Sequence, residues 1–215
     1  MCLRFELEVY LLASFNAHLL TKIKNTVYPA VDCVFYCVLF KYLEGGMFLG
    51  LDYGTSEVKA ILMSADGRIV GSRGAGLTVS RPQPMHSEQD PADWWAATLV
   101  ALAALRTDCA DEFAQVKAIG LSGQMHGAVL LDEANQVIRP AILWNDMRSH
   151  VECEELTAKV PNLYALAGNL AMAGFTAPKL LWVAKHEPEH FKATRKVLLP
   201  KDYIRFLLTG QMVSD

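Results

Sequence analysis

Short apolar runs separated by turn-forming residues begin at residue 47. One mainly apolar run spans 47–52 and ends in Asp52, a second spans 58–63, and a third extends from Arg68 toward Val79. The tight-turn signal 65–67 joins the last two runs. Connections this short join antiparallel neighbours, because parallel strands need a long crossover. The pattern therefore predicts three antiparallel strands at the start of a domain.

A long helix is expected directly after these strands. Asp90 has a side chain suited to the N-cap, and Pro91 suits the first helical position. Apolar residues then recur at spacings of three and four, which is typical of a helix with one buried face. We expect a helix over 91–106, with Trp94 and Trp95 packed in the core and at the rim of the sheet.

The rest of the chain alternates between strand and helix patterns. Proline and glycine residues mark several of the boundaries. Strands are expected over 116–121, 128–132, 141–144 and 197–199, and helices over 149–159, 178–186 and 201–208. The whole pattern predicts an α/β fold with a mixed sheet and flanking helices.

Residues 1–46 differ from the rest of the chain. They are rich in phenylalanine, tyrosine, leucine, valine and cysteine and show no clean period. Their longest apolar run, 27–40, contains Pro29 and Asp32 and is shorter than the roughly 18–20 residues that cross a bilayer. The start of the chain also lacks the pattern of a signal peptide. We expect 1–46 to be an extension without a catalytic role and 47–215 to form the folded domain.

Charge and cysteine content narrow the class of partner. Lysine and arginine total 20 against 23 aspartate and glutamate, and the formal net charge is -3. No general basic field exists to hold nucleic acid or an anionic membrane, so a small molecule is the better partner. The five cysteines lack the spacing of a zinc site. They indicate reduced thiols and a cytoplasmic protein.

Polar loops follow three of the expected strands, where ligands bind in α/β folds. The first loop, 52–56, places the Asp52 carboxylate where it could hold a hydrated Mg²⁺ ion. Gly54 permits close approach of the backbone, and Thr55 and Ser56 offer hydroxyl and N–H groups to phosphate oxygens. The same string is also compatible with an ordinary hairpin turn whose hydroxyls bond to the local backbone.

The second loop, 122–127, carries an amide, a thioether and an imidazole in Gln124, Met125 and His126. Flexible glycines flank the trio, and its chemistry suits a polyol. A lone histidine in a loop is, however, often a surface or backbone-bonded residue.

The third loop, 144–148, could stack Trp144 on a sugar face and bond sugar hydroxyls with Asn145 and Asp146. Alternatively, Trp144 belongs to the core and Asp146 simply pairs with Arg148.

In their order along the chain, these segments resemble the FGGY carbohydrate kinases, and within that family the bacterial xylulokinases. The resemblance extends from Met47 to the end of the chain. Its motifs are 48–56, 77–82, 87–91 with Trp94 and Trp95, 120–127, 139–146, 168–170, 174–186, 197–203 and 208–210.

The resemblance implies the N-terminal part of the first lobe of an actin-like, ribonuclease H-like ATPase fold. It also implies transfer of the γ-phosphoryl group of ATP to D-xylulose, giving D-xylulose 5-phosphate. In that reaction Asp52 would organise Mg²⁺ and phosphate, with Gly54, Thr55 and Ser56 beside the γ-phosphate.

The sugar would lie against the second and third loops. Met125 and His126 occupy positions where xylulokinases hold the sugar and glycerol kinases carry Arg-Glu. The resemblance also places near the pocket Gln124, Trp144, Asn145 and Asp146.

Three further residues of the matching motifs are expected to be structural. Lys179 and Trp182 would fix packing and a lobe surface, and Asp202 would cap the helix that it begins.

The matching part of a family member is its N-terminal part only. In family members the aspartate that acts as general base, and the lobe that binds adenosine, lie beyond the position of residue 215. We therefore expect this chain alone to lack appreciable kinase activity. Two alternatives stay open: a non-catalytic sugar-binding or dimerising module, with a possible homodimer, and an FGGY kinase for another ketose or polyol.

Overall fold

The computed structural model describes residues 46–214. The expected extension, 1–46, therefore lies almost entirely outside the described residues.

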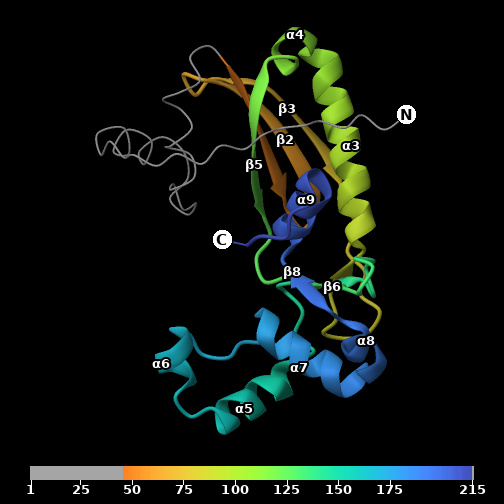
Figure 1. The fold of residues 1–215 in the computed structure, drawn as a ribbon, viewed down its shortest axis with the longest axis vertical. Coiled ribbons are helices and arrows are strands. Elements are labelled where there is room, and N and C mark those ends of the chain that lie inside the picture. Colours follow the sequence, from red (N-terminus) through yellow and green to blue (C-terminus); the bar gives the residue numbers. More distant parts are fainter. Residues whose placement is uncertain (1–45, 215) are drawn as a thin grey trace.

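A four-stranded mixed sheet forms the upper part of the molecule (Figure 1). Its strands are β1 (Met47–Tyr53), β2 (Glu57–Ser64), β3 (Ile69–Gly76) and β5 (Val116–Gly123). Their order is β3-β2-β1-β5, with β1 antiparallel to β2 and parallel to β5. The three antiparallel strands predicted from the sequence are confirmed.

Helix α3 (Pro91–Asp108) runs along this sheet and supplies much of its core (Figure 1). The Asp90 side chain accepts a hydrogen bond from the Ala92 N–H at 2.9 Å, so the predicted N-cap is confirmed. Trp94 is fully buried and Trp95 is partly buried against the same core, also as predicted. Helix α9 (Pro200–Thr209) contacts both α3 and β5.

Two short antiparallel pairs and several helices make up the lower part of the molecule (Figure 1). The pairs join β4 (Glu88–Gln89) to β7 (Ala141–Ile142) and β6 (Val129–Leu131) to β8 (Lys196–Leu198). The helices are α5 (His150–Lys159), α6 (Leu163–Ala167), α7 (Thr176–His186) and α8 (Pro188–Ala193). A second apolar cluster of Ala128, Leu130, Ile142 and Val183 fixes α7 to these strands.

Several predicted boundaries are wrong for physical reasons. Helix α7 begins at Thr176 rather than Pro178, because a proline in the first helical turn needs no N–H partner. Strand β7 ends at Ile142, since the chain turns at Trp144. The short helices α4 (Ala110–Phe113), α6 and α8 are too brief to show a helical period in the sequence.

The prediction that Asp202 caps its helix is also wrong. Helix α9 starts at Pro200, so Asp202 already lies inside the first turn, and no side chain caps that end. The buried Asp202 carboxylate instead accepts hydrogen bonds from Lys201 Nζ and Ser214 Oγ, both at 2.7 Å.

Within residues 46–214, none of the helices combines the length and the hydropathy needed to span a membrane.

Truncation of the buried face of α3 tests this packing. Leu105→Ala removes a fully buried side chain from the sheet core and should lower the free energy of unfolding by about 2–5 kcal/mol. Leu99→Ala, on the exposed side of the same helix, should change it by no more than about 0.5 kcal/mol. Urea unfolding of both variants measures the difference, and equal losses would contradict this assignment of the core.

Candidate functional site

The first loop follows the end of β1 and carries the exposed carboxylate of Asp52. Asp52 pairs in register with Lys59 of β2 and Ser122 of β5, and its side chain is exposed. Gly54 makes a close turn, since a Cβ there would lie 3.2 Å from the Glu57 carbonyl oxygen. Ser56 is exposed beside this turn. The loop thus presents a carboxylate, a hydroxyl and backbone groups at one strand end.

The three predicted loops meet through a chain of side-chain hydrogen bonds. Trp144 Nε1 donates to Thr55 Oγ1 at 2.9 Å, and Thr55 Oγ1 donates to Gln124 Oε1 at 3.3 Å. The Thr55 hydroxyl therefore bonds to the other two loops rather than to its own turn. Trp144 is 47% exposed, so the alternative that assigned it to the core is wrong.

Gln89, which the sequence analysis missed as a site residue, connects the first and second loops by hydrogen bonds. Its buried amide Nε2 donates to the Thr55 carbonyl at 2.7 Å. Its Oε1 accepts from Trp94 Nε1 at 3.0 Å and from Gln124 Nε2 at 2.9 Å. Gln89 lies in a motif that carried the resemblance, but nothing in the local pattern indicates that its side chain turns inward.

Tyr53 fixes the base of the first loop. Its side chain is fully buried, and its hydroxyl lies 3.0 Å from Thr98 Oγ1 in a hydrogen bond. Burial raises the pKa of Tyr53 to about 12, against the smaller opposing effect of the Thr98 bond. The phenol is therefore neutral at physiological pH. The Tyr53 carbonyl also accepts the Gln124 N–H at 2.8 Å, which attaches the second loop to the first.

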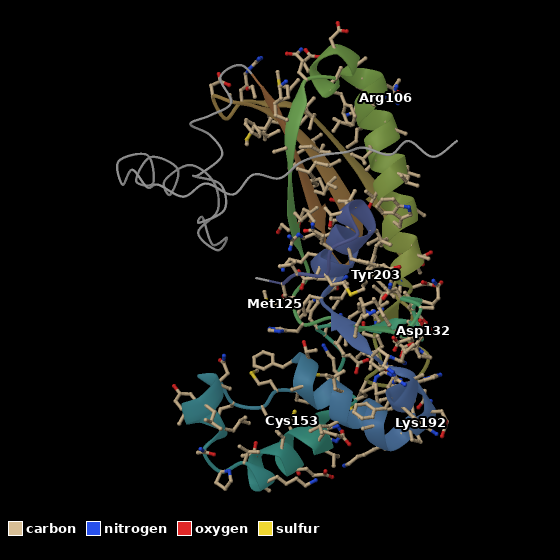
Figure 2. The ribbon with its side chains drawn as sticks, in the orientation of Figure 1. Arg106, Met125, Asp132, Cys153, Lys192 and Tyr203 are labelled. Carbon is tan, nitrogen blue, oxygen red and sulfur yellow. The ribbon has the colours of Figure 1, made fainter. Side chains whose placement is uncertain are left out.

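Met125 lies in the second loop, near the junction of the sheet and the lower helices (Figure 2). Met125 is 63% exposed, whereas His126 is partly buried with its ring 4.4 Å from that of Phe175. Burial, and then the nearby Lys179 charge, lower the pKa of His126. The imidazole is thus neutral at pH 7 and can both donate and accept hydrogen bonds.

In the third loop, one of the residues predicted to bind the sugar is directed into the protein interior. Asp146 is fully buried and its carboxylate is bound by Arg148, whose Nη2 lies 2.7 Å from Oδ2. The Ser87 N–H donates to the same oxygen at 2.6 Å. Pairing with Arg148, the alternative open at the sequence level, is confirmed. A sugar contact by this carboxylate stays a prediction.

Asn145 lies beside an open hollow of about 500 Å³ formed mainly by 81–87. Its Oδ1 is buried and has no hydrogen-bond partner among residues 46–214.

A network of buried ion pairs, which the sequence analysis also missed, packs against the third loop. Glu88 Oε1 receives Arg139 Nη2 at 2.5 Å and Arg148 Nη2 at 2.7 Å. Arg139 Nε also lies 2.7 Å from Glu187 Oε2. The Arg148 guanidinium lies 4.8 Å from the centre of the Trp182 ring, which confirms the packing role predicted for Trp182.

Lys179 of α7 is fully buried, which confirms the packing role predicted for it. Its Nζ donates to the carbonyl oxygens of His126 at 2.8 Å and Gly174 at 2.6 Å. Burial lowers the pKa of Lys179 to about 8; Asp146 opposes this shift and Arg148 adds to it.

The donor set at the strand ends fits the expected magnesium ion only in a limited way. Within the described part of the chain, no group of three or more histidine, cysteine or acidic side chains could enclose a metal ion. Mg²⁺, however, commonly keeps several waters and binds one or two carboxylates together with substrate phosphates. The exposed Asp52 carboxylate is compatible with that kind of site.

Solved structures with this architecture define the class of protein. The fold superposes on the "xyloylose kinase" from Brucella ovis with a TM-score of 0.75 at 55% identity, covering 77% of this chain and 34% of that one. The xylulose kinase from Rhodospirillum rubrum gives a TM-score of 0.75 at 36% identity, covering 79% and 35%. The domain therefore has the actin-like ATPase fold of sugar kinases, as expected.

Sequence comparison then gives the family. Residues 47–215 match the model of the N-terminal domain of the FGGY family of carbohydrate kinases, and the chain belongs to this family. The xylulose kinase of Escherichia coli K12 is 54% identical over 169 residues, which are 79% of this chain and 34% of that protein. The chain thus spans about a third of the length of such curated relatives.

Loss of the Gln89 amide should leave buried groups without partners. In Gln89→Leu, the Thr55 carbonyl and Trp94 Nε1 lose their hydrogen bonds, which should lower the free energy of unfolding by about 1–3 kcal/mol. Gln83→Leu, at an exposed position of the preceding loop, is the matched control and should change little. Urea unfolding compares them, and a Gln89→Leu chain as stable as the control would refute this role.

The pKa of Lys179 predicts a pH-dependent stability. Between pH 8 and the ordinary lysine pKa of 10.5, the unfolded chain holds this proton more tightly than the folded chain. The free energy of unfolding of the wild type, relative to Lys179→Met, should therefore rise by about 3 kcal/mol across this window. Urea unfolding of both proteins from pH 7.5 to 10.5 measures the difference, and a flat difference would contradict the depressed pKa.

Proposed function

We propose that this chain is the part of a xylulokinase that binds D-xylulose and the transferred phosphoryl group. The complete enzyme would phosphorylate D-xylulose with ATP to give D-xylulose 5-phosphate. The observation that carries the proposal is the meeting of the three loops through Trp144, Thr55 and Gln124, beside the exposed Met125. The xylulose kinases among the relatives and solved structures support the choice of sugar.

The residues of the site suit a reaction that depends on orientation. Phosphoryl transfer needs in-line positioning and neutralisation of charge more than covalent help from the protein. Gln124, the neutral His126 imidazole and the exposed Trp144 would orient the sugar by hydrogen bonds and by contact with the indole face. Trp144 and Gln124 hold the side chain of Thr55, and the backbone N–H groups of 54–56 would face phosphate oxygens.

Charge at the phosphate would depend on Asp52. A carboxylate beside a phosphate repels it unless a cation lies between them. In this proposal Asp52 holds hydrated Mg²⁺, which neutralises phosphate charge when bound. The general base and the adenosine site belong to the rest of the complete enzyme. A cytoplasmic location is also proposed, supported by the free thiols of Cys109 and Cys153.

A coupled ADP-release assay with Mg-ATP and D-xylulose tests the proposal. It compares this chain with a version extended to the length of its curated relatives. Only the extended version should turn over, because the chain spans about a third of its relatives' length, the proposal assigns the base and the adenosine site to the remainder, and a base typically contributes about 10²- to 10⁴-fold. Turnover of another ketose or polyol in preference to D-xylulose would reassign the substrate. Turnover by neither version, or equal turnover by both, would overturn the proposal.

Variants of the extended version assign the roles. Asp52→Asn should lower kcat on the order of 10²-fold or more, since it removes charge at the phosphate. His126→Ala should mainly raise the KM for D-xylulose and leave that for ATP near its wild-type value. Asp111→Asn, in α4 at the far end of the sheet, is the matched control for the loss of a carboxylate (Figure 1).

A further inference from the structure

His126 has a strained backbone. Its φ is +62°, and the Gly127 N–H donates to the Met125 carbonyl at 2.8 Å. A bond from residue i+2 to residue i around a positive φ is a γ-turn of the rare, strained kind. A non-glycine residue in such a conformation is energetically unfavourable and persists only where its surroundings hold it. Something outside the loop must therefore hold His126 in this turn.

The beginning of α7 supplies two donors to the carbonyl of this residue. Lys179 Nζ donates to the His126 oxygen at 2.8 Å and Thr176 Oγ1 donates to it at 3.2 Å. This oxygen belongs to the same peptide unit as the Gly127 N–H that closes the γ-turn, so fixing the oxygen fixes the turn. Phe175, immediately before α7, packs against the His126 ring at a centroid distance of 4.4 Å.

The same lysine also reaches the segment that packs on the third loop. Lys179 Nζ donates to the Gly174 oxygen at 2.6 Å. Gly174 lies so close to the third loop that a Cβ there would be 2.5 Å from the Trp144 carbonyl oxygen. One ammonium group therefore connects the backbone of His126 to the backbone beside Trp144.

A role in packing alone would not need an ammonium group at this position. Lys179 is fully buried, and in the described residues no carboxylate lies within ion-pair distance of its Nζ. Burying a charge is unfavourable unless hydrogen bonds compensate it. Here the compensating acceptors are the carbonyls of two site segments, so the charge is used to hold backbone in place.

We propose that Lys179, assisted by Thr176, is a positioning residue that holds His126 in its γ-turn and so directs Met125 and His126 toward the sugar. The sugar part of this inference rests on the proposed function. The backbone part does not.

Nuclear magnetic resonance on the isotope-labelled 215-residue chain tests the backbone part. The intraresidue HN–Hα NOE of residue 126 is strong when φ is positive. Lys179→Met removes the donor and keeps the side-chain length, and it should weaken this NOE. Lys185→Met is the matched control, because the partly exposed Lys185 lies on the same helix but pairs with Glu152 and Glu155 of α5 rather than with the loop backbone. It should leave the NOE unchanged.

Kinetics of the extended version test the sugar part. Lys179→Met should raise the KM for D-xylulose on the order of tenfold, with little change in the KM for ATP, as expected from a misplaced sugar-binding loop. The control Lys185→Met should keep both constants. A folded Lys179→Met chain with an unchanged residue 126 NOE would overturn the proposal, and so would a weakened NOE with an unchanged sugar KM.

Two other results, a Lys179→Met chain that does not fold and a wild type that does not phosphorylate D-xylulose, can be distinguished from those above. If Lys179→Met does not fold, Thr176→Val decides, since it removes one donor and leaves the buried lysine in place. It should weaken the NOE to a smaller degree, and no change would overturn the proposal. If the wild-type extended version fails to phosphorylate D-xylulose, the proposed function fails, whereas the NOE still decides whether Lys179 holds the γ-turn.

Discussion

The arrangement of the site depends on the Gln89 side-chain amide. A single buried group bonds the Thr55 carbonyl, Trp94 Nε1 and Gln124 Nε2, so the first loop, the long helix and the second loop share one anchor. Each partner is a polar group that would be costly to bury alone. A displacement of any one loop would break bonds in the others. The loops therefore form one rigid unit rather than three independent turns.

The hydrophobic core gives this anchor its fixed position. Gln89 lies in β4, two residues before α3, and the buried face of α3 packs on the four-stranded sheet. On the other side, the ion network of Glu88, Arg139 and Arg148 holds β4 against the third loop. Buried charges of this kind add little net stability, but the loss of one partner is strongly destabilising because it leaves an uncompensated buried charge. Packing thus places the strand, and polar contacts select the loop geometry.

The sequence predicts the parts of this molecule that depend on local patterns. The three antiparallel strands, the Asp90 cap and the three polar loops all follow from periodicity and turn residues. Contacts made across long stretches of chain could not be predicted in this way. Gln89 reaches Gln124, and Lys179 reaches His126, 53 residues earlier, and no local signal marks either side chain as inward-facing. The strained turn at His126 was missed for the same reason, since histidine is enriched at positive φ but most histidines still have a negative φ, so the residue type alone does not predict the turn.

The charge distribution at the loops explains how this site could divide its tasks. Tyr53 is neutral at physiological pH, as any tyrosine with a pKa of 10 would be, and burial raises its pKa further. Burial, and then the charge of Lys179, lower the pKa of His126, which favours its neutral form. Lys59, beside Asp52 in the sheet, pairs with Glu57 at 3.1 Å. Asp52 therefore remains the exposed charge at the end of β1. In the proposed kinase, neutral groups such as the His126 imidazole would orient the sugar hydroxyls without attracting or repelling phosphate. A cation bound at Asp52 would neutralise the phosphate charge.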